Sequence, residues 1–379
     1  MSKIIVLGAG MVGSAMAIDL ATSHQVMLSD VNTAALENAA KKCPKLKTMI
    51  LDVTDRTSLQ QVISQYDLVV CAVPGFLGFT TLKAIIEAKV DVVDISFFSE
   101  DALELDALAK RNKVTAIVDC GVAPGMDNVI LGYYNEHLNI THFECLVGGL
   151  PKQKKWPFLY KAPFSPIDVI EEYTRPARYV ENGHEIIREA LSDCEYVSFD
   201  KIGTLESFNS DGLRSIIHTM SHIPNMKEKT LRYPGHVEYI KVLKESGFFA
   251  EKPISVKGQA VSPRDFTCAI LFNEWKLGET EEELTVMRVT LQGTNKNGEK
   301  QEIVYNLYDE YDHQTQTSSM ARTTGYTATA AVNMMVDGVF SEKGVFPPEL
   351  VGRHGACFEY FMRYLKQRNI NYVKSSRLL

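Results

Sequence analysis

The run Lys3-Ile4-Ile5-Val6-Leu7-Gly8-Ala9-Gly10-Met11-Val12-Gly13 decides how the beginning of the chain folds. It starts as a continuous apolar segment, as expected for a strand that is buried on both faces. Val12, Met16 and Leu20 then recur every four residues, which is the spacing of a helix. A Gly-x-Gly-x-x-Gly pattern between a strand and a helix predicts a dinucleotide-binding turn, although incidental glycines in an ordinary strand–turn–helix are the alternative.

Each residue type in this turn has a mechanical role in the predicted site. Gly8 permits the tight turn, Gly10 lets the backbone approach a pyrophosphate, and Gly13 lets the helix pack closely on the strand. The free N–H groups and the positive end of the helix dipole, near Met11 and Val12, attract phosphate. We therefore expect Gly8, Gly10, Met11, Val12 and Gly13 to contact the cofactor.

The next apolar segment, residues 25–28, is followed by Asp30. A carboxylate at the end of the second strand can accept hydrogen bonds from the ribose hydroxyls of a dinucleotide. It would repel a 2′-phosphate, and no Arg or Lys occurs in residues 31–34 to hold one. The sequence therefore predicts NAD rather than NADP, and Asp30 strengthens the dinucleotide interpretation over incidental glycines.

Length and composition are those of a globular protein with room for two domains. The chain has 379 residues, of which 45% are hydrophobic and 23% charged. The net charge is −7 and there is no long basic run, which argues against nucleic-acid binding. No apolar stretch approaches the roughly 20 residues that a membrane span requires, so no membrane association is predicted.

The seven cysteines are scattered and form no Cys-x-x-Cys pair, so neither a disulfide frame nor a zinc site is indicated. His218 and His222 are four residues apart, but no further ligand accompanies them, and a solvated helix face is the better interpretation. We predict no metal site. The first residues lead directly into the first strand, without a signal peptide, and a reduced cytoplasmic setting is expected.

Apolar runs and helical segments alternate through the first third of the chain, which predicts a doubly wound parallel sheet in an α/β domain covering residues 1–121. Strands are expected at 4–7, 25–28, 48–53, 67–73, 90–95 and 114–118. Helices are expected at about 34–42, 57–64, 78–88 and 101–111.

Ligands of such sheets bind outside the carboxyl ends of the strands. Those ends carry Asp52-Val53, Ala72-Val73-Pro74, Ser96-Phe97 and Asp119-Cys120-Gly121. Asp52 and Val53 are expected near the adenine, and Ala72, Val73 and Pro74 beneath the nicotinamide half. For Asp52 a helix-capping role is an equal alternative.

The pattern changes near residue 122. A helix is predicted at 126–138, a strand at 143–149, and a long aromatic and proline-rich loop at 151–166 that could cover a site. Segments 284–292 and 302–307, joined through Asn297-Gly298, predict an antiparallel hairpin. An inserted α+β domain at 122–320 follows. Helices are predicted at 321–336 and 357–366 and a turn-like stretch at 338–348, and the segment 321–379 is expected to return and pack on the first domain.

Several stretches together resemble the saccharopine dehydrogenase-like family, and within it lysine 6-dehydrogenases more than saccharopine reductases. Besides the glycine turn, they are 119–126, 148–151, 172–177, 205–208, 229–236, 320–322 and 344–349. The resemblance spans nearly the whole chain in order. It implies a Rossmann domain built from both chain ends, an inserted domain for substrate and dimerisation, and a homodimer.

The resemblance also implies hydride transfer at a carbon that bears an amine. The position of Ala123 looks to be an aspartate in saccharopine reductases, so its absence here favours a smaller amino acid. By resemblance, the substrate lies near Ser96, Phe97, Gly148, Phe164, Ser210 and Thr230. Residues 209–212 depart from the lysine enzyme's pattern.

Oxidising an amine requires a group that accepts a proton. Asp119 is a candidate base because it ends the sixth strand beside the expected nicotinamide; a carboxylate that only orients the turn before Gly121 is the alternative. Glu206 could pair with a substrate ammonium, or could be a surface carboxylate on a strand.

Arg232 suits a substrate α-carboxylate because its planar guanidinium can donate two hydrogen bonds at once. A structural role in the site or a solvated charge are the alternatives. His236 follows closely and is a second candidate for substrate binding, with a buried packing histidine as the commoner fate.

The sequence thus predicts an NAD-dependent oxidoreductase acting on the CH–NH2 group of an amino acid, similar to lysine 6-dehydrogenase. A second enzymatic possibility is reductive joining of an amine and an aldehyde, as in saccharopine or carboxyspermidine formation. A third, of another class, is a dinucleotide-binding regulator without turnover.

Overall fold

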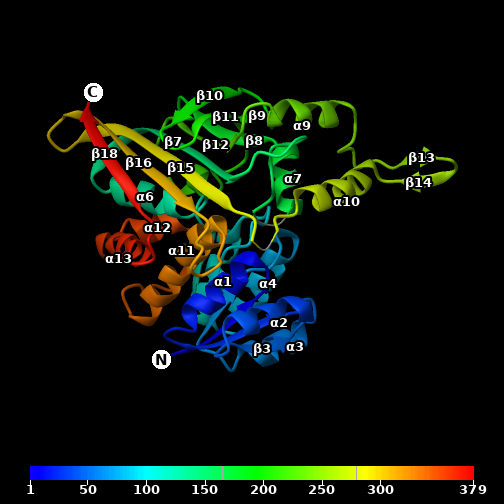
Figure 1. The fold of residues 1–379 in the computed structure, drawn as a ribbon. Coiled ribbons are helices and arrows are strands. Elements are labelled where there is room, and N and C mark those ends of the chain that lie inside the picture. The colour runs from blue at the N-terminus through cyan, green and yellow to red at the C-terminus, as the bar shows by residue number, and fades with distance from the viewer. Residues whose placement is uncertain (164–165, 279) are drawn as a thin grey trace.

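The computed structural model describes residues 1–163, 166–278 and 280–379. Its elements form two parts, each built around one large sheet (Figure 1). The first sheet has seven parallel strands in the order β17-β6-β5-β4-β1-β2-β3. Their bounds are β1 Lys3–Leu7, β2 Gln25–Asp30, β3 Lys47–Ile50, β4 Leu68–Cys71, β5 Asp91–Asp94, β6 Thr115–Ile117 and β17 Gly344–Phe346. The predicted doubly wound parallel sheet is confirmed.

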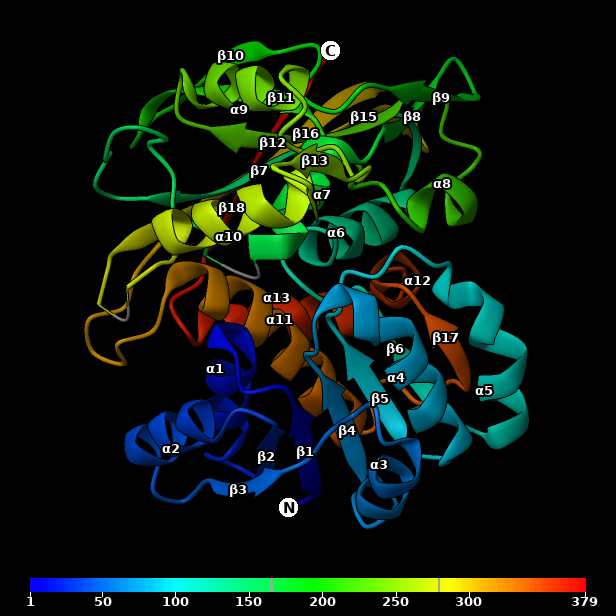
Figure 2. The same ribbon diagram turned by 90° about the vertical axis from the view of Figure 1, so that its right-hand side faces the viewer.

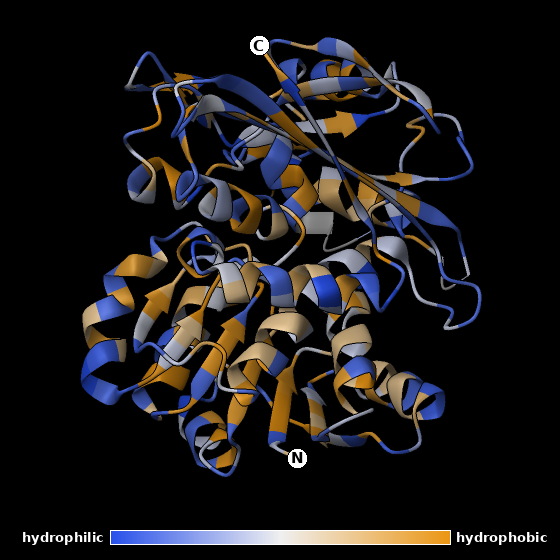
Figure 3. Cartoon of the chain, turned by 90° about the vertical axis from the view of Figure 1, so that its left-hand side faces the viewer, coloured by the Kyte–Doolittle hydropathy of each residue, from blue (hydrophilic) through white to orange (hydrophobic). Residues whose placement is uncertain are grey.

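Helices cover both faces of this sheet. Successive residues of a strand point to opposite faces, and both faces of the strands carry apolar side chains that need to be buried. In β1, Ile4 and Val6 join one buried apolar cluster, and Ile5 and Leu7 join another. Figure 3 shows the strands of this sheet coloured mainly as hydrophobic, with helices on either side of them. These helices are α1 Met11–Leu20, α2 Thr33–Lys42, α3 Arg56–Ile63, α4 Gly75–Glu87, the 3-10 helix η1 Ala102–Leu105 and α5 Asp106–Asn112.

The seventh strand comes from the end of the chain. β17 pairs with β6 in parallel, so the prediction of six strands was one short. The segment 344–346 was interpreted as part of a turn-like stretch. A strand of three residues that begins with a glycine and is followed by two prolines is too short to show a periodicity, and it forms because it pairs with β6.

The second sheet is mixed and has nine strands, with the path β10-β11-β12-β7-β15-β16-β18. β7 Leu138–Pro151 and β12 Met226–Arg232 are parallel, and β15 Glu283–Asn295 and β16 Lys300–Glu310 form the predicted antiparallel hairpin. The remaining strands are β8 Ala177–Glu181, β9 His184–Arg188, β10 Glu195–Phe199, β11 Gly203–Asn209 and β18 Tyr372–Leu378. β13 Ile254–Val256 and β14 Gln259–Val261 form a separate hairpin.

Figure 2 shows the mixed sheet above the parallel sheet, with α6 Met126–Asn135 and α11 Ser319–Val336 between them. The other helices are α7 Pro166–Thr174, α8 Ile216–Thr219, α9 His236–Glu245, α10 Pro263–Trp275, α12 Pro348–Gly352 and α13 Gly355–Lys366. α6 ends three residues before the predicted limit because β7 begins at Leu138. No helix among the described residues is long and apolar enough to cross a membrane.

The segment after residue 320 is shared between the two sheets. α11 packs on α1, and β17 extends the parallel sheet. β18, however, pairs with β16 at the edge of the mixed sheet. The expectation that the whole segment 321–379 packs on the first domain therefore needs correction for residues 372–378. These residues pair with β16 because the backbone N–H and C=O groups of a strand need hydrogen-bond partners.

Candidate active site

The glycine turn has the geometry of a phosphate-binding loop. Gly8 has φ +107°, and a Cβ atom there would lie 2.4 Å from the Ala72 carbonyl oxygen. A Cβ on Gly13 would lie 2.0 Å from the Gly8 carbonyl oxygen, so α1 packs against β1 as closely as a helix can. Gly10 has nothing within 4 Å of its Cβ position and immediately precedes α1. The backbone at Gly10 is therefore open to a ligand, at the end of the helix that attracts anions.

Asp30 lies beside this turn. Its Oδ2 accepts a hydrogen bond from the Ala9 N–H at 2.6 Å, and its Oδ1 accepts one from the Asn32 N–H at 2.8 Å. The carboxylate thus links the end of β2 to the glycine turn. Each carboxylate oxygen has a second lone pair, which remains a suitable acceptor for ribose hydroxyls.

The other residues predicted to contact the cofactor follow β3 and β4. The Asp52 carboxylate is exposed and accepts hydrogen bonds from the Thr54 N–H and hydroxyl. The residue that caps α3 is Asp55, so the capping alternative for Asp52 was wrong. Val53 follows Asp52 in this turn, and Ala72, Val73 and Pro74 lead from β4 into α4, with Ala72 in contact with Gly8.

Asp94 is a buried carboxylate that the sequence interpretation missed. It ends β5, where Ser96 donates its backbone N–H to Oδ1 at 2.9 Å and its hydroxyl to Oδ2 at 3.2 Å. Burial raises the pKa of Asp94 to about 7. The available signal was an acidic residue at the end of an otherwise apolar strand, next to the predicted site residue Ser96.

Asp119 forms an ion pair that joins the two halves of the molecule. Arg214, in the loop between β11 and α8, donates its Nε–H to Asp119 Oδ2 at 2.9 Å, and both side chains are 6% exposed. Arg214 also donates to the Phe98 carbonyl oxygen, and its guanidinium lies 4.7 Å from the centre of the Phe97 ring. Asp119 Oδ1 is buried and has no hydrogen-bond partner among the described residues.

Arg214 was also missed by sequence interpretation. Its signal was a single arginine in the apolar segment 213–217. Ser96, Phe97, Asp94, Asp119 and Arg214 thus come together at the carboxyl ends of β5 and β6, on the side of the sheet where ligands are expected.

The remaining predicted substrate residues are placed differently. Ser210, the residue after β11, and Thr230 on β12 share a hydrogen bond of 2.8 Å between their hydroxyls. Gly148 is a packing position, since a Cβ there would lie 2.6 Å from the Leu231 carbonyl oxygen. Phe164 lies outside the described residues, so its predicted role stays a prediction.

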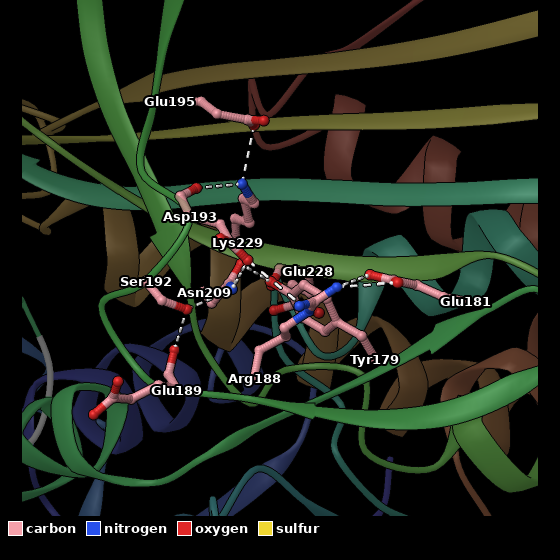
Figure 4. A network of polar contacts seen from close by, with 10 residues as sticks. All are labelled: Tyr179, Glu181, Arg188, Glu189, Ser192, Asp193, Glu195, Asn209, Glu228 and Lys229. Atoms are coloured by element: carbon pink, nitrogen blue, oxygen red, sulfur yellow. Dashed lines mark hydrogen bonds and ion pairs between the residues drawn. The ribbon is translucent and has the colours of Figure 1, made fainter.

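Residues 209–212, where the sequence departs from the lysine enzyme's pattern, are tightly held. Asn209 accepts from the Tyr179 hydroxyl and donates to Ser192 and Asp193, within the polar network of Figure 4. Asp211 forms a two-point ion pair with Arg178. A Cβ on Gly212 would lie 2.1 Å from the Glu228 carboxyl carbon. The departure therefore serves local packing around the Arg214 loop.

Arg232 is not positioned to bind a substrate. It is 2% exposed and donates to Glu172 Oε2 at 2.6 Å, and its guanidinium stacks 4.4 Å from the centre of the Tyr160 ring. The predicted carboxylate contact needs correction, because protein groups already engage the guanidinium. Of the alternatives, the structural role fits and the solvated charge does not. Sequence spacing could not reveal Glu172, which lies on a different element.

His236 and Glu206 belong to the same interior. The two ring nitrogens of His236 hydrogen-bond to the Tyr173 hydroxyl and the Phe158 carbonyl oxygen, and burial lowers the pKa of His236 to about 3, so the ring is neutral. Glu206 is buried, not on the surface, and accepts from the Gly235 N–H. Both predicted roles toward substrate therefore give way to packing roles, since the register of β11 on β12 directs Glu206 inward.

Comparison with known proteins places this geometry in a family. The model of the saccharopine dehydrogenase NADP binding domain matches residues 4–117, and that of the saccharopine dehydrogenase C-terminal domain matches residues 121–370.

Curated relatives cover almost the whole chain. The chain is 25% identical to the carboxyaminopropylagmatine dehydrogenase of Synechocystis over 92% of both proteins. It is 23% identical to the NADP+, L-glutamate-forming saccharopine dehydrogenase of Pyricularia oryzae, over 91% of this chain and 93% of the relative. It is 24% identical to the carboxynorspermidine synthase of Vibrio alginolyticus over 91% of each.

Solved structures share the fold. The apo saccharopine dehydrogenase (L-Glu forming) of Saccharomyces cerevisiae superimposes with a TM-score of 0.79 at 21% identity, covering 100% of both chains. The homospermidine synthase of Legionella pneumophila, in complex with NAD, superimposes with a TM-score of 0.69 at 12% identity over 99% of this chain and 91% of the other. The two-sheet architecture, with its dinucleotide-binding half, is thus shared.

Proposed function

Because this chain belongs to the saccharopine dehydrogenase family, whose oxidoreductases act on amine groups, we propose that it is an NAD-dependent dehydrogenase for an amino acid. The proposed reaction is oxidation at a side-chain CH–NH2 group, as in a lysine 6-dehydrogenase. One observation carries the proposal: Asp119 presents a buried carboxylate oxygen, without a hydrogen-bond partner among the described residues, beside the Arg214 guanidinium at the carboxyl end of the sheet.

The residues of the parallel sheet suit a bound dinucleotide, which would supply the hydride acceptor. Gly10 and the start of α1 would hold its pyrophosphate, where the open Cβ space lets the backbone approach. Asp30 would accept the ribose hydroxyls and disfavour a 2′-phosphate. This charge argument supports NAD for this chain, although some relatives are named for NADP+.

Asp119 and Arg214 suit opposite ends of an amino acid. Asp119 Oδ1 would accept a proton from the substrate nitrogen. This nitrogen must be neutral before the carbon that bears it can give up a hydride. Arg214 holds Asp119 Oδ2 through Nε, and its Nη2 has no hydrogen bond within the described part of the chain. That nitrogen can donate to a substrate carboxylate.

A second candidate is the reductive joining of an amine and an aldehyde. The observation that favours it is the naming of relatives along nearly the whole chain: carboxyaminopropylagmatine dehydrogenase and carboxynorspermidine synthase. Both candidates use a secondary or primary amine beside the same carboxylate, so they differ in substrate and direction and not in the site.

The experiment is a coupled pair of absorbance screens. Purified protein with NAD+ is tested against amino acids and di- and polyamines for NADH formation, and protein with NADH is tested against amine and aldehyde pairs for NADH loss. Asp119→Asn, which keeps the size of the side chain, should lower kcat strongly while NAD binding persists. If NAD binds but no combination turns over, both enzymatic proposals fail and a non-catalytic dinucleotide-binding regulator is supported.

A further inference from the structure

Three side chains with metal-ligating atoms meet inside the second domain, away from the residues proposed for catalysis. They are Asp127, Cys145 and Glu228, and their ligand atoms all lie within 4.8 Å of one another. All three residues are buried, with Asp127 and Cys145 at 0% and Glu228 at 3% exposure. No sequence spacing indicated this group, because its members come from three separate elements.

The backbone holds these three positions rigidly. Cys145 on β7 and Glu228 on β12 are direct register partners in the parallel ladder, so their side chains lie next to each other on one face of the sheet. Asp127 is the second residue of α6, which packs against β7. The Glu228 carboxyl is further confined by Gly212, which contacts it.

The cluster contains negative groups without partners. Asp127 Oδ1 accepts from the Gly125 N–H, but Asp127 Oδ2 and Glu228 Oε2 have no hydrogen-bond partner in the part of the chain that the structure describes. Neither carboxylate forms an ion pair with a Lys or Arg in the described ranges 1–163, 166–278 and 280–379. A buried carboxylate oxygen without a hydrogen bond or a counter-charge destabilises the folded state. A bound cation, or protons on the carboxylates, would satisfy these oxygens.

We propose that Asp127, Cys145 and Glu228 bind one zinc ion. Two carboxylate oxygens and a thiolate carry a charge of −3 when ionised, which a divalent ion offsets while satisfying both unpartnered oxygens. Thiolate is a soft ligand that favours zinc over magnesium or calcium, and three protein ligands leave the fourth tetrahedral position for a water.

The ion would have a structural role. It would tie the start of α6 to the β7–β12 pair, and Glu228 contacts Gly212, two residues before Arg214. Without a cation, burial raises the pKa of Asp127 to about 7 and that of Glu228 and the Cys145 thiol well above their usual ranges, so protons would take its place. Zinc and protons are therefore the competing occupants.

The test uses full-length protein without a histidine tag, purified without chelator and supplied with zinc during expression. Elemental analysis should find about one zinc per chain. Cys145→Ser and Glu228→Gln should each lose the metal, whereas the matched control Cys357→Ser, another buried cysteine that is not part of the cluster, should keep it. NAD binding by each variant reports that the fold is intact.

Two further measurements decide the matter if a variant does not fold. Chelator followed by added zinc should lower and then restore the Tm of the wild-type protein. Cobalt substitution should produce a thiolate-to-metal charge-transfer absorption. The proposal would be overturned if the purified protein contained no zinc and its Tm did not change with chelator or with added zinc. The two carboxyl groups would then share protons instead. The outcome is independent of the proposed enzymatic function.

Discussion

At the scale of single residues, burial decides which charged groups are available for chemistry. Arg232 and Arg214 are both buried arginines, but the Arg232 guanidinium is engaged by Glu172 and Tyr160 within one domain. Arg214 instead faces Asp119 from the other half of the molecule. The local sequence favours Arg232 as the arginine that binds substrate, because of its motif. The contacts in the structure favour Arg214 for that role.

The pH dependence of stability should reveal Asp94. Burial raises the pKa of Asp94 to about 7 in the folded protein. An aspartate of the unfolded chain has a pKa of about 4. Between these values the folded protein retains a proton that the unfolded chain has released, so stability falls as pH rises through this window. Asp94→Asn removes this contribution and should be more stable than the wild type by about 1–3 kcal/mol near pH 8.

Chemical denaturation at a series of pH values measures this effect, with Asp101→Asn, the exposed cap of the 3-10 helix η1, as the control. An Asp94→Asn variant whose stability changes with pH as steeply as that of the wild type would refute the raised pKa. Asn can still accept the hydrogen bond from the Ser96 N–H, so loss of that contact does not confuse the comparison.

Cofactor preference should follow the charge at position 30. Asp30→Arg exchanges a group that repels a 2′-phosphate for one that binds it, so the ratio of NAD to NADP affinity should fall by at least tenfold, about 1.4 kcal/mol. Titration of both cofactors measures the ratio. An unchanged ratio, with the fold intact by circular dichroism, would remove Asp30 from the ribose site.

At the scale of elements, the contact between β1 and α1 separates two kinds of glycine. Gly13 is needed for packing, because a Cβ would press on the Gly8 carbonyl oxygen, while Gly10 is needed only for a ligand to approach. The regular strands and helices around them were predictable because apolar runs and four-residue spacing are local signals. β17 was not, since a three-residue strand exists only through its pairing with β6.

Alanine substitutions should separate these two roles. Gly13→Ala should lower the Tm, with a cost of roughly 1–3 kcal/mol for overpacking, and weaken NAD binding as a consequence. Gly10→Ala should leave the Tm near that of the wild type and still weaken NAD binding. Thermal unfolding with and without NAD measures both effects; equal Tm losses in the two variants would contradict the assignment.

At the scale of the whole molecule, the Asp119–Arg214 ion pair connects the dinucleotide-binding half to the inserted domain. Both partners are almost completely buried, and Arg214 also holds the Phe98 carbonyl oxygen. Removing one partner of a buried pair leaves an uncompensated charge, which costs about 3–5 kcal/mol. The ion pair is therefore a contact between the two domains that is made by two side chains far apart in sequence.

A double-mutant cycle tests this dependence. Arg214→Met should lower the Tm substantially, and adding Asp119→Asn should recover part of the loss because the unpaired charge is gone. Tm values of the four proteins, measured at one pH, define the coupling. Additive losses in the double variant would show that the two residues do not act as a pair.

The sequence by itself determined the cofactor turn, the parallel sheet, the β15–β16 hairpin and the family, because these depend on residue type and short spacing along the chain. The tertiary structure alone decided that Arg214 and not Arg232 meets Asp119, that β17 completes the parallel sheet while β18 joins the mixed one, and that Asp127, Cys145 and Glu228 share one interior. The physical reason is that burial and charge pairing are set by which elements pack together, and no periodicity within one segment records its distant partner.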